Sequence, residues 1–411
     1  SGSQGSGIFA AQGTVNLNGP IDAKFSAKDI QAGMLVKSAG LKADAKGLVN
    51  LEAQFNGTID NPGADVSLNV LGGGSGNATF DTLTGLLNLR NGIINVNQFI
   101  VQKQIKKQTY RASASGSILL KALTAAADED LDNYEQFNLD VSLDDADLSL
   151  LPIFSKQVDW AIGETNGSVK VTGTLAHPLL NGMLELPEGA MKLKALKTPV
   201  TKMKGVVRFA GDQVSIEECS GHLGDGKYNL TGSSHFSGGK FSQYAFDLQA
   251  DKLDINSPFY RGPLSGELHL NEGEIFHHIM PKLSGKILAD DVTISIPAIP
   301  DSDGELPRML LDIDLQLGKK VHFFSPSLYN MRLAGSAHFG GTTRHPQTSG
   351  TVSVLRGTVT YNQAIFKIRE GEAYFNQVDS FLPSILLRAD TKLSQTKIYL
   401  AIDGPANQMS I

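Results

Sequence analysis

The sequence is poor in the residues that bridge or fill a compact core. It has one cysteine, one tryptophan and an aromatic content of 7%. Because Cys219 is alone, no disulfide can form within the chain, and cysteine usage leaves the redox compartment open. No apolar run approaches the roughly 18 residues of a membrane-spanning helix. The scarcity of aromatic residues argues against the aromatic-rich core of a compact sandwich.

An excess of positive charge is also lacking. The chain carries 36 basic and 42 acidic residues, for a net charge of −6. A protein that binds nucleic acid normally shows a basic stripe. The short basic run of Lys103, Lys106 and Lys107 is interpreted as a solvated strand edge. We therefore expect no nucleic-acid partner.

Recognisable catalytic and metal-binding patterns are absent as well. No Gly-x-Ser-x-Gly elbow accompanies the serines and histidines. His269, Glu274, His277 and His278 are close in sequence, but adjacent histidines on a strand point to opposite faces, so we interpret them as loop or surface residues. The segment Asp301–Glu305 begins like a calcium loop and lacks the distal glutamate. We expect no enzyme activity, no metal and no cofactor.

The sequence is rich in the residue types that are common in strands and tight turns. It has 43 glycines, and β-branched and aliphatic residues fill the intervals between them. Period-two alternation of apolar and polar residues predicts strands with one apolar and one wet face, typical of antiparallel or open sheets. Helical periodicity is nearly absent, and one short helix is expected over 147–160. The clearest alternating segments are Val66–Val70, Leu139–Leu143, Val169–Thr172, Met183–Leu186, Phe246–Leu248, Leu311–Leu317, Val352–Val354 and Ile398–Ile402.

A short motif recurs between strands. The pattern Gly-Thr-x-x-x-Pro occurs at Gly57–Pro62 and Gly173–Pro178, and in a looser context at Gly341–Pro346. Glycine permits a positive φ and proline interrupts the strand ladder, so the pair predicts a chain reversal at a fixed offset. Similar steps into a strand, Leu180–Leu184 and Thr348–Val352, follow the two later copies. The recurrence indicates a repeat architecture.

An alternating sheet must bury its apolar face against something. Here the inward positions are mainly aliphatic, so a single curled sheet would leave an apolar trough open on one side, and large exposed apolar patches normally mark binding surfaces. Any one strand is more often plain core; only the unbroken series favours a groove for acyl chains, whose attraction is non-directional. The candidate groove residues are Val169, Val171, Leu184, Leu186, Phe246, Leu248, Ile313, Leu315, Leu317, Val352, Val354, Val359, Phe366, Ile368, Ile398, Leu400 and Ile402.

The repeated turns and the C-terminal segments together resemble the TamB family, within the wider AsmA-like group. The resemblance covers roughly residues 137–411 and rests on small motifs. Segments from about Leu139 to Phe339 are similar to the upstream β-groove repeats of that family. The C-terminal motifs are Gly350–Tyr361, Phe366–Ile368, Glu370–Phe375, Pro383–Ala389 and Leu400–Pro405.

The resemblance implies an elongated all-β fold, a β-taco or repeating β-groove with a hydrophobic concave face and very little helix. It implies a protein of the periplasm of a diderm bacterium, anchored in the inner membrane and reaching the outer membrane. Family members are implicated in phospholipid transfer and, with an outer-membrane TamA-type barrel of the Omp85 class, in assembly of outer-membrane proteins. We expect this chain to be a fragment without the inner-membrane anchor or the final strands.

The expected organisation has four parts. Residues 1–127 form N-terminal β-groove repeats, of which about the first seven resemble an added linker. Residues 128–136 form an acidic loop and 137–345 form central repeats. Residues 346–411 begin a TamB-type C-terminal domain that is cut short. Each boundary follows a change in composition or motif.

The predicted function is a bridge segment that carries phospholipid between the inner and outer membranes through a hydrophobic groove and so contributes to outer-membrane biogenesis. One alternative is a scaffold for assembly of outer-membrane proteins or autotransporters with an Omp85-type barrel, templating strands at open sheet edges. Another is a structural β-solenoid adhesin with a filled core.

Overall fold

The computed structural model is built almost entirely from β-strands. It describes residues 2–4, 7–16, 19–38, 45–75, 78–105, 107–121, 136–143, 146–155, 157–174, 177–237, 240–257, 260–275, 277–295 and 308–406. The expected acidic loop at 128–136 lies almost entirely outside these residues, and the calcium-like segment at 301–305 lies wholly outside them. The boundary between residues 345 and 346 stays a prediction.

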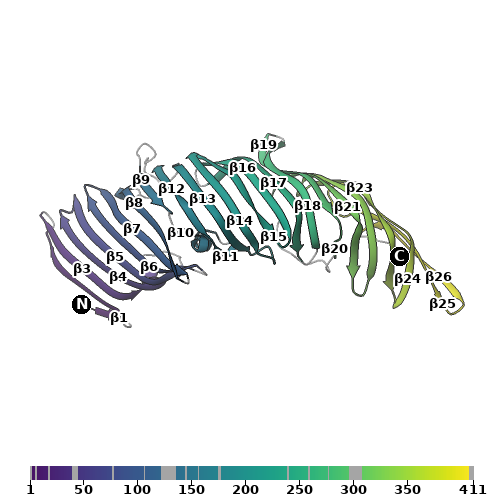
Figure 1. The fold of residues 1–411 in the computed structure, drawn as a ribbon, viewed down its shortest axis with the longest axis horizontal. Coiled ribbons are helices and arrows are strands. Elements are labelled where there is room, and N and C mark those ends of the chain that lie inside the picture. The colour runs from purple at the N-terminus through teal and green to yellow at the C-terminus, as the bar shows by residue number, and fades with distance from the viewer. Residues whose placement is uncertain are drawn as a thin grey trace. The chain divides into compact units, whose positions relative to one another are not determined.

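The chain divides into two compact units. The first contains residues 1–195, 202–219 and 234–242, and the second contains 196–201, 220–233 and 243–411. Four strands contribute residues to both units: β14 (Val200–Gly211), β15 (Gln213–Leu223), β16 (Gly226–Ser237) and β17 (Lys240–Asn256). Within each unit, successive strands lie side by side (Figure 1).

The first unit is an antiparallel meander in which neighbours in sequence pair from β1 to β9. It continues through β9–β12 and β12–β13, while β10 pairs with β12 and β11 pairs with β13. Its elements are β1 (Gly2–Gln4), β2 (Gly7–Val15), β3 (Ile21–Gln31), α1 (Ala32–Ser38), β4 (Lys46–Gly57), β5 (Pro62–Ser75), β6 (Ala78–Arg90), β7 (Ile93–Ile105), β8 (Gln108–Leu119), β9 (Phe137–Ser142), β10 (Ala146–Asp147), the 3₁₀ helix η2 (Leu148–Leu150), α3 (Leu151–Phe154), β11 (Val158–Ile162), β12 (Glu164–Gly173) and β13 (Pro178–Leu193).

The second unit contains the longer strands. They are β17 (Lys240–Asn256, which begins in the first unit), β18 (Tyr260–Ile275), β19 (His278–Ala289), β20 (Thr293–Ile294), β21 (Leu310–Ser325), β22 (Tyr329–Thr342), β23 (Pro346–Tyr361), β24 (Ala364–Phe375), β25 (Ser384–Leu393) and β26 (Thr396–Pro405). Consecutive strands pair antiparallel from β17 to β19 and from β21 to β26. The all-β prediction is confirmed, and each alternating segment named above lies in a strand, except that Leu143 follows the end of β9.

One junction differs from the antiparallel expectation. Strands β19 and β21 pair in parallel, with Gly285 opposite Ile313 and Ala289 opposite Leu317. The two-residue strand β20 pairs with both β18 and β21. A parallel pair needs a connection much longer than a hairpin turn, and here the chain between β19 and β21 spans residues 290–309. Period-two alternation reports which face a side chain occupies and carries no information on strand direction, so the sequence could not reveal this junction.

The three Gly-Thr-x-x-x-Pro motifs form the same turn, as predicted. In each, the glycine pairs with the proline: Gly57 with Pro62, Gly173 with Pro178 and Gly341 with Pro346. The threonine amide donates to the carbonyl three residues on, at 3.1, 3.2 and 3.1 Å. The threonine hydroxyl accepts from the amide of that same residue, at 3.2, 3.0 and 2.9 Å. The glycines have φ of +88°, +87° and +75°, which favours glycine.

The helix expected over 147–160 is wrong in extent. Helical residues run only from Leu148 to Phe154, and Trp160 lies in β11, paired with Lys192 of β13. The Asp147 carboxylate caps the short helical segment by accepting from the amides of Ser149 (2.8 Å) and Gly163 (2.9 Å). Residues 158–162 instead form a strand with a register shift between Val158 and Trp160, so that Val158 and Ala161 are buried and Trp160 and Ile162 are exposed. Pairing with β13 outweighs the apolar stripe that suggested a longer helix.

Bulges interrupt the long strands of the second unit near their midpoints. Register shifts occur between Leu317 and Val321 of β21, between Arg332 and Leu333 of β22, and between Ile368 and Glu370 of β24. A bulge bends its strand and increases the local twist. The register shifts of neighbouring strands lie close together along the sheet, and we call this line of shifts, from Leu317–Val321 to Ile368–Glu370, the crease. Leu315 and Leu317, before the β21 bulge, belong to the same apolar cluster as Val321, after it.

Candidate functional site

The apolar face of the sheet carries most of the predicted groove residues. In the first unit, Val169 of β12 lies opposite Val141 of β9 on one side and Gly182 of β13 on the other. Val169 is buried, whereas Val171, Leu184 and Leu186 are half-buried. Lys170, between Val169 and Val171, lies on the opposite face of the sheet and forms an exposed ion pair with Asp140 at 3.9 Å. The two faces of this sheet are therefore chemically distinct.

The same separation holds in the second unit. Strand pairing places Leu248, Leu268, Gly285, Ile313 and Phe339 in one row across β17, β18, β19, β21 and β22. A second row contains the candidate Phe246 and runs through Leu270, Leu283 and Leu311. The apolar side chains of both rows are half-buried.

Intervening positions on these strands form ion pairs on the opposite face. His338 pairs with Asp314 at 2.8 Å and Lys282 pairs with Asp312 at 2.8 Å, both across neighbouring strands. The Lys282 ammonium donates to the Asp312 carboxyl and holds its pKa below the usual value. We call the two sides of the second unit the apolar face and the polar face.

Burial on the apolar face increases towards the crease. The row nearest the bulges contains Ala289, Leu317 and Val352, which are exposed by only 1%, 5% and 7%. Strand pairing links them through Gly335. Rows further along the strands, including Ile313 and Leu315, are half-buried. Side chains on the apolar face are thus buried at the crease and more exposed to solvent away from it.

Towards the C-terminus the apolar face is filled by its own side chains. Phe366, Ile368 and Leu400 are buried in one cluster, against which Val354, Val359 and Ile402 pack. The cluster also contains Met331, Leu387 and Ala389, which are not among the predicted groove residues. Val321, with no exposed surface, and Val292 were missed in the neighbouring cluster. Alternation over 329–333 was a usable signal for Met331, whereas residues 385–389 are largely apolar and show no clear alternation. Among the C-terminal candidates, Ile398 is the exception, being 36% exposed and in neither cluster.

Tyr260 is a half-buried tyrosine beside this region. Its ring packs against the cluster at the crease, and its hydroxyl donates to the carbonyl of Pro263 at 2.7 Å. Burial raises the pKa of Tyr260 to about 12, because the charged phenolate would lose its hydration. The group therefore remains neutral over the physiological range and contributes a satisfied hydrogen bond.

The histidines considered for a metal site do not converge. His269 contacts Asp247 across β17 and β18 on the polar face. His277 lies in the turn before β19, with a φ of +62°, and pairs with Glu274 at 3.3 Å. Within the described residues, no group of three histidine, cysteine, aspartate or glutamate side chains has the arrangement of a metal site. In the same part of the chain, no helix has the length and hydropathy needed to cross a membrane.

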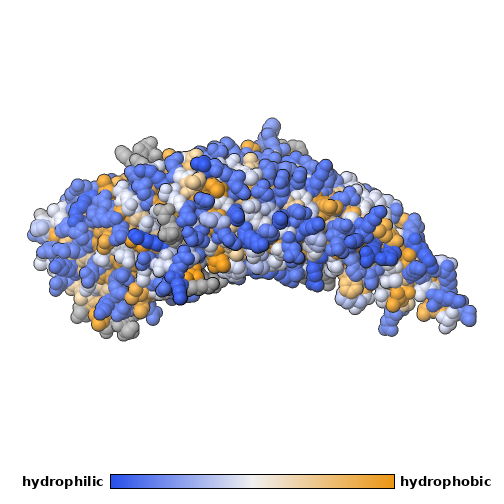
Figure 2. Space-filling model, viewed as in Figure 1, coloured by the Kyte–Doolittle hydropathy of each residue, from blue (hydrophilic) through white to orange (hydrophobic). Residues whose placement is uncertain are grey.

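The surface of the molecule shows the division between apolar and polar residues less clearly than the pairing of the strands does. On the side drawn in Figure 2, hydrophilic residues predominate and hydrophobic residues show in smaller groups between them. The half-buried rows must therefore be followed from the pairing of the strands. Largely exposed apolar side chains also occur, such as Ile365 on β24 and Tyr399 on β26.

Residues 242–411 match the family model described as the TamB C-terminal domain. The matched range coincides closely with the second unit, whose continuous part runs from 243 to 411. It includes the expected C-terminal segment and part of the expected central repeats. A search of curated proteins finds no match.

Proposed function

We propose that this chain, which carries a TamB-type C-terminal domain over residues 242–411, is part of a periplasm-spanning bridge whose apolar face carries phospholipid acyl chains between two membranes. The family match supports a role in the translocation and assembly module of the outer membrane. The finer assignment, to lipid, rests on the chemistry of the apolar face.

The observation that carries the proposal is the burial gradient of the second unit. The row through Leu317 and Val352 is buried. The row from Leu248 through Ile313 to Phe339 and the row from Phe246 to Leu311 are half-buried, although their residues other than Gly285 are all aliphatic or aromatic. Apolar surface left accessible in a continuous row attracts hydrocarbon in proportion to the area covered, at roughly 25 cal/mol per Å². An aliphatic row has no polar group that would fix an acyl chain at one position. Such a surface suits a ligand that must slide.

Lipid extraction from the purified chain tests this function. The chain is isolated from cells in a detergent-free buffer, its folding is checked by circular dichroism, and an organic extract is analysed by mass spectrometry. Co-purifying phospholipid is the expected result. A folded, monodisperse protein whose extract contains no phospholipid contradicts the proposal.

A photocrosslinking residue then locates the contact. Placed at Ile313, on the half-buried row, it should label lipid; placed at Ser336, which is exposed on the polar face of β22, it should not. Leu400 is less suitable, because it is 6% exposed and reports on its own cluster. Labelling of protein at both positions, with no lipid adduct at Ile313, would contradict a lipid groove.

A second candidate function is a scaffold that adds strands from client proteins to an open edge, with an Omp85-type barrel as the partner. Strand β26 supports it, because in the described part of the chain β26 pairs with β25 alone. A client strand could hydrogen-bond to its other side. Lys397 and Pro405 at the two ends of β26 are residue types that blunt an edge. A crosslinker at Ile398 that captures an unfolded outer-membrane protein would favour this function.

The β-solenoid adhesin has less support. Its coils stack consecutive strands in parallel, whereas consecutive strands here pair antiparallel from β1 to β9, from β17 to β19 and from β21 to β26. The half-buried rows also count against a fully filled core.

A further inference from the structure

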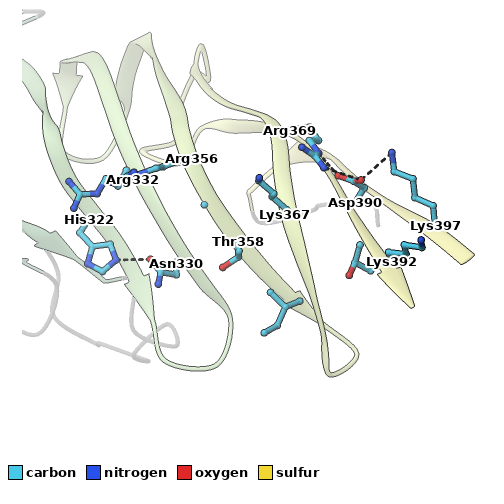
Figure 3. Close-up of a pocket in the computed structure, with 13 residues that line it drawn as sticks. His322, Asn330, Arg332, Arg356, Thr358, Lys367, Arg369, Asp390, Lys392 and Lys397 are labelled. Carbon is cyan, nitrogen blue, oxygen red and sulfur yellow. Dashed lines mark hydrogen bonds and ion pairs between the residues drawn. The ribbon is translucent and has the colours of Figure 1, made fainter. Parts of the chain in front are cut away.

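The polar face of the second unit has a hollow of about 830 Å³ over β21–β26. Its lining is strongly basic although the whole chain has a net charge of −6. The cations are Arg332, Arg356, Lys367, Arg369, Lys392 and Lys397, and Asp390 is the one carboxylate among the lining residues (Figure 3). This cationic hollow lies on the opposite side of the strands from the proposed lipid groove and does not depend on it.

Two pairs of like charges face each other directly across strands in the cationic hollow. Arg332 of β22 is opposite Arg356 of β23, and Lys392 of β25 is opposite Lys397 of β26. Like charges in directly opposed positions destabilise a sheet. Figure 3 shows the two arginines extending side by side on adjacent strands. A bound anion would turn this repulsion into attraction.

The single carboxylate leaves most of the cations uncompensated. Asp390 is 7% exposed, accepts from Arg369 and forms an ion pair with Lys397 at 3.2 Å. Within the described residues, no ion pair involves Arg332, Arg356, Lys367 or Lys392. The side chains of Arg356, Lys367 and Lys392 are exposed and that of Arg332 is half-buried, so they are available to a ligand.

Neutral hydrogen-bonding groups lie between the cations. Thr358 is opposite Asn330 on β22 and Lys367 on β24. The Asn330 amide oxygen contacts the His322 ring at 2.8 Å, which leaves the amide N–H₂ as a donor. Arginine, lysine, hydroxyl and amide donors in one hollow match the many acceptor oxygens of phosphate groups.

The size and surroundings of the cationic hollow select among anions. It spans six neighbouring strands, on the order of 20 Å at the usual strand spacing, so one carboxylate or one phosphate would meet only part of it. An acidic peptide cannot be added as a strand inside the hollow, because β22, β23, β24 and β25 are each paired on both sides. Added to the free side of β26, it would lie beside the strand that contributes only Lys397 to the lining. We propose that the cationic hollow binds a ligand or surface that presents several phosphate groups.

Two sources of such phosphates are tested with two probes. Inorganic tripolyphosphate supplies a soluble form and is titrated into the whole chain by calorimetry. Vesicles of phosphatidylglycerol in phosphatidylcholine supply a lipid form and are tested by co-sedimentation against vesicles of phosphatidylcholine alone. Binding to at least one probe is expected, and the probe that binds identifies the source. Binding to neither overturns the proposal.

Matched charge variants test the location. The triple variant Arg332→Gln, Arg356→Gln, Lys367→Gln should weaken binding at least about tenfold, which corresponds to about 1.4 kcal/mol. The control Lys286→Gln, Lys319→Gln, Lys320→Gln removes the same charge from exposed positions outside the lining and should change affinity less than about twofold. Equal losses in the two variants would show nonspecific attraction and overturn the proposal.

Two further measurements distinguish a change in phosphate binding from a loss of folding. Asp390→Asn should tighten binding, because it releases Arg369 and Lys397 towards the ligand. Poly-glutamate of equal total charge should compete at least about tenfold less well than the phosphate probe. Stronger competition by poly-glutamate, or weaker phosphate binding by a folded Asp390→Asn variant, would overturn the assignment to phosphate.

Discussion

At the scale of single residues, glycines within strands matter as much as glycines in turns. Gly335 of β22 has a φ of +141°, and a Cβ at this position would lie 2.2 Å from the carbonyl oxygen of Thr351 on β23. Gly167 of β12 lies six residues before the turn glycine Gly173, as Gly335 lies six before Gly341; it has a φ of +131°, and a Cβ there would lie 2.1 Å from the carbonyl oxygen of Met183. From the sequence, glycine is expected mainly in turns. These positions show a second use, the close approach of neighbouring strands.

We expect Gly335→Val to destabilise the second unit by about 1–3 kcal/mol, because valine rarely adopts this φ and its Cβ would meet backbone. The neighbouring change Ala334→Val, at a position opposite Ser353 with no positive φ, should cost much less. Urea denaturation of both variants, followed by circular dichroism, measures the difference. Equal midpoints would show that the strands can separate at Gly335 without cost.

Asp390 predicts a dependence of stability on pH. Arg369 donates to its carboxyl and Lys397 lies close, so the pKa of Asp390 is below its usual value in the folded chain. A depressed pKa stabilises the fold above the pKa of the unfolded state, roughly 3.9, and that contribution is lost as pH falls through the folded value. The difference in Tm between the wild type and Asp390→Asn should therefore be full near pH 7 and shrink below about pH 4.

Thermal unfolding over a range of pH checks this expectation, with Asp251→Asn as the control. Asp251 is exposed and outside the Arg369–Asp390–Lys397 group. The control should give a much smaller Tm difference that changes little with pH. A Tm difference for Asp390→Asn that grew on acidification would contradict the assigned direction.

At the scale of elements, the repeated turn is the most regular structure in the chain. Three copies share a left-handed glycine, a reciprocal pair of bonds between the threonine and the third residue after it, and a proline that begins the next strand. Each copy sets the register of the hairpin that it closes. Register matters because a shift of one residue would move the apolar side chains to the wet face.

Thr342→Val tests the turn, since valine retains the β-branched shape and removes the hydroxyl that accepts from the His345 amide at 2.9 Å. We expect a loss of stability of about 0.5–1.5 kcal/mol, as for one hydrogen bond. Thr342→Ser keeps the acceptor and should retain most of that stability. Chemical denaturation distinguishes the two, and a valine variant as stable as the wild type would show that the glycine and proline suffice.

At the scale of the whole molecule, both units have an apolar face and a polar face, and strand pairing keeps them separate in each. In the second unit the apolar face is closed at the crease and half-exposed away from it, while the polar face holds the cationic hollow. One set of strands thus offers two surfaces of opposite chemistry. A change on one face can be compared with a matched change on the other.

Ile313→Asp places a charge on the half-buried apolar row and should remove most co-purifying phospholipid, since hydrocarbon cannot solvate a carboxylate. Ser336→Asp introduces the same group on the exposed polar face and should leave the lipid content near that of the wild type. Lipid per protein, measured by mass spectrometry on folded samples, checks the pair. Equal lipid content in both variants would contradict a groove at Ile313.

Local pattern alone determined the strands, their two faces and the repeated turns. Alternation such as Ile313, Asp314 and Leu315 can be satisfied in a strand only by sending successive side chains to opposite faces, and Gly341 with Pro346 permits few other conformations. Tertiary structure decided what depends on partners distant in sequence. The parallel pairing of β19 with β21, the strand at Trp160 and the alignment of bulges into a crease arise from which strands become neighbours. The cationic hollow arises in the same way, because Arg332, Arg356, Lys367 and Lys397 belong to four different strands and meet only through their register.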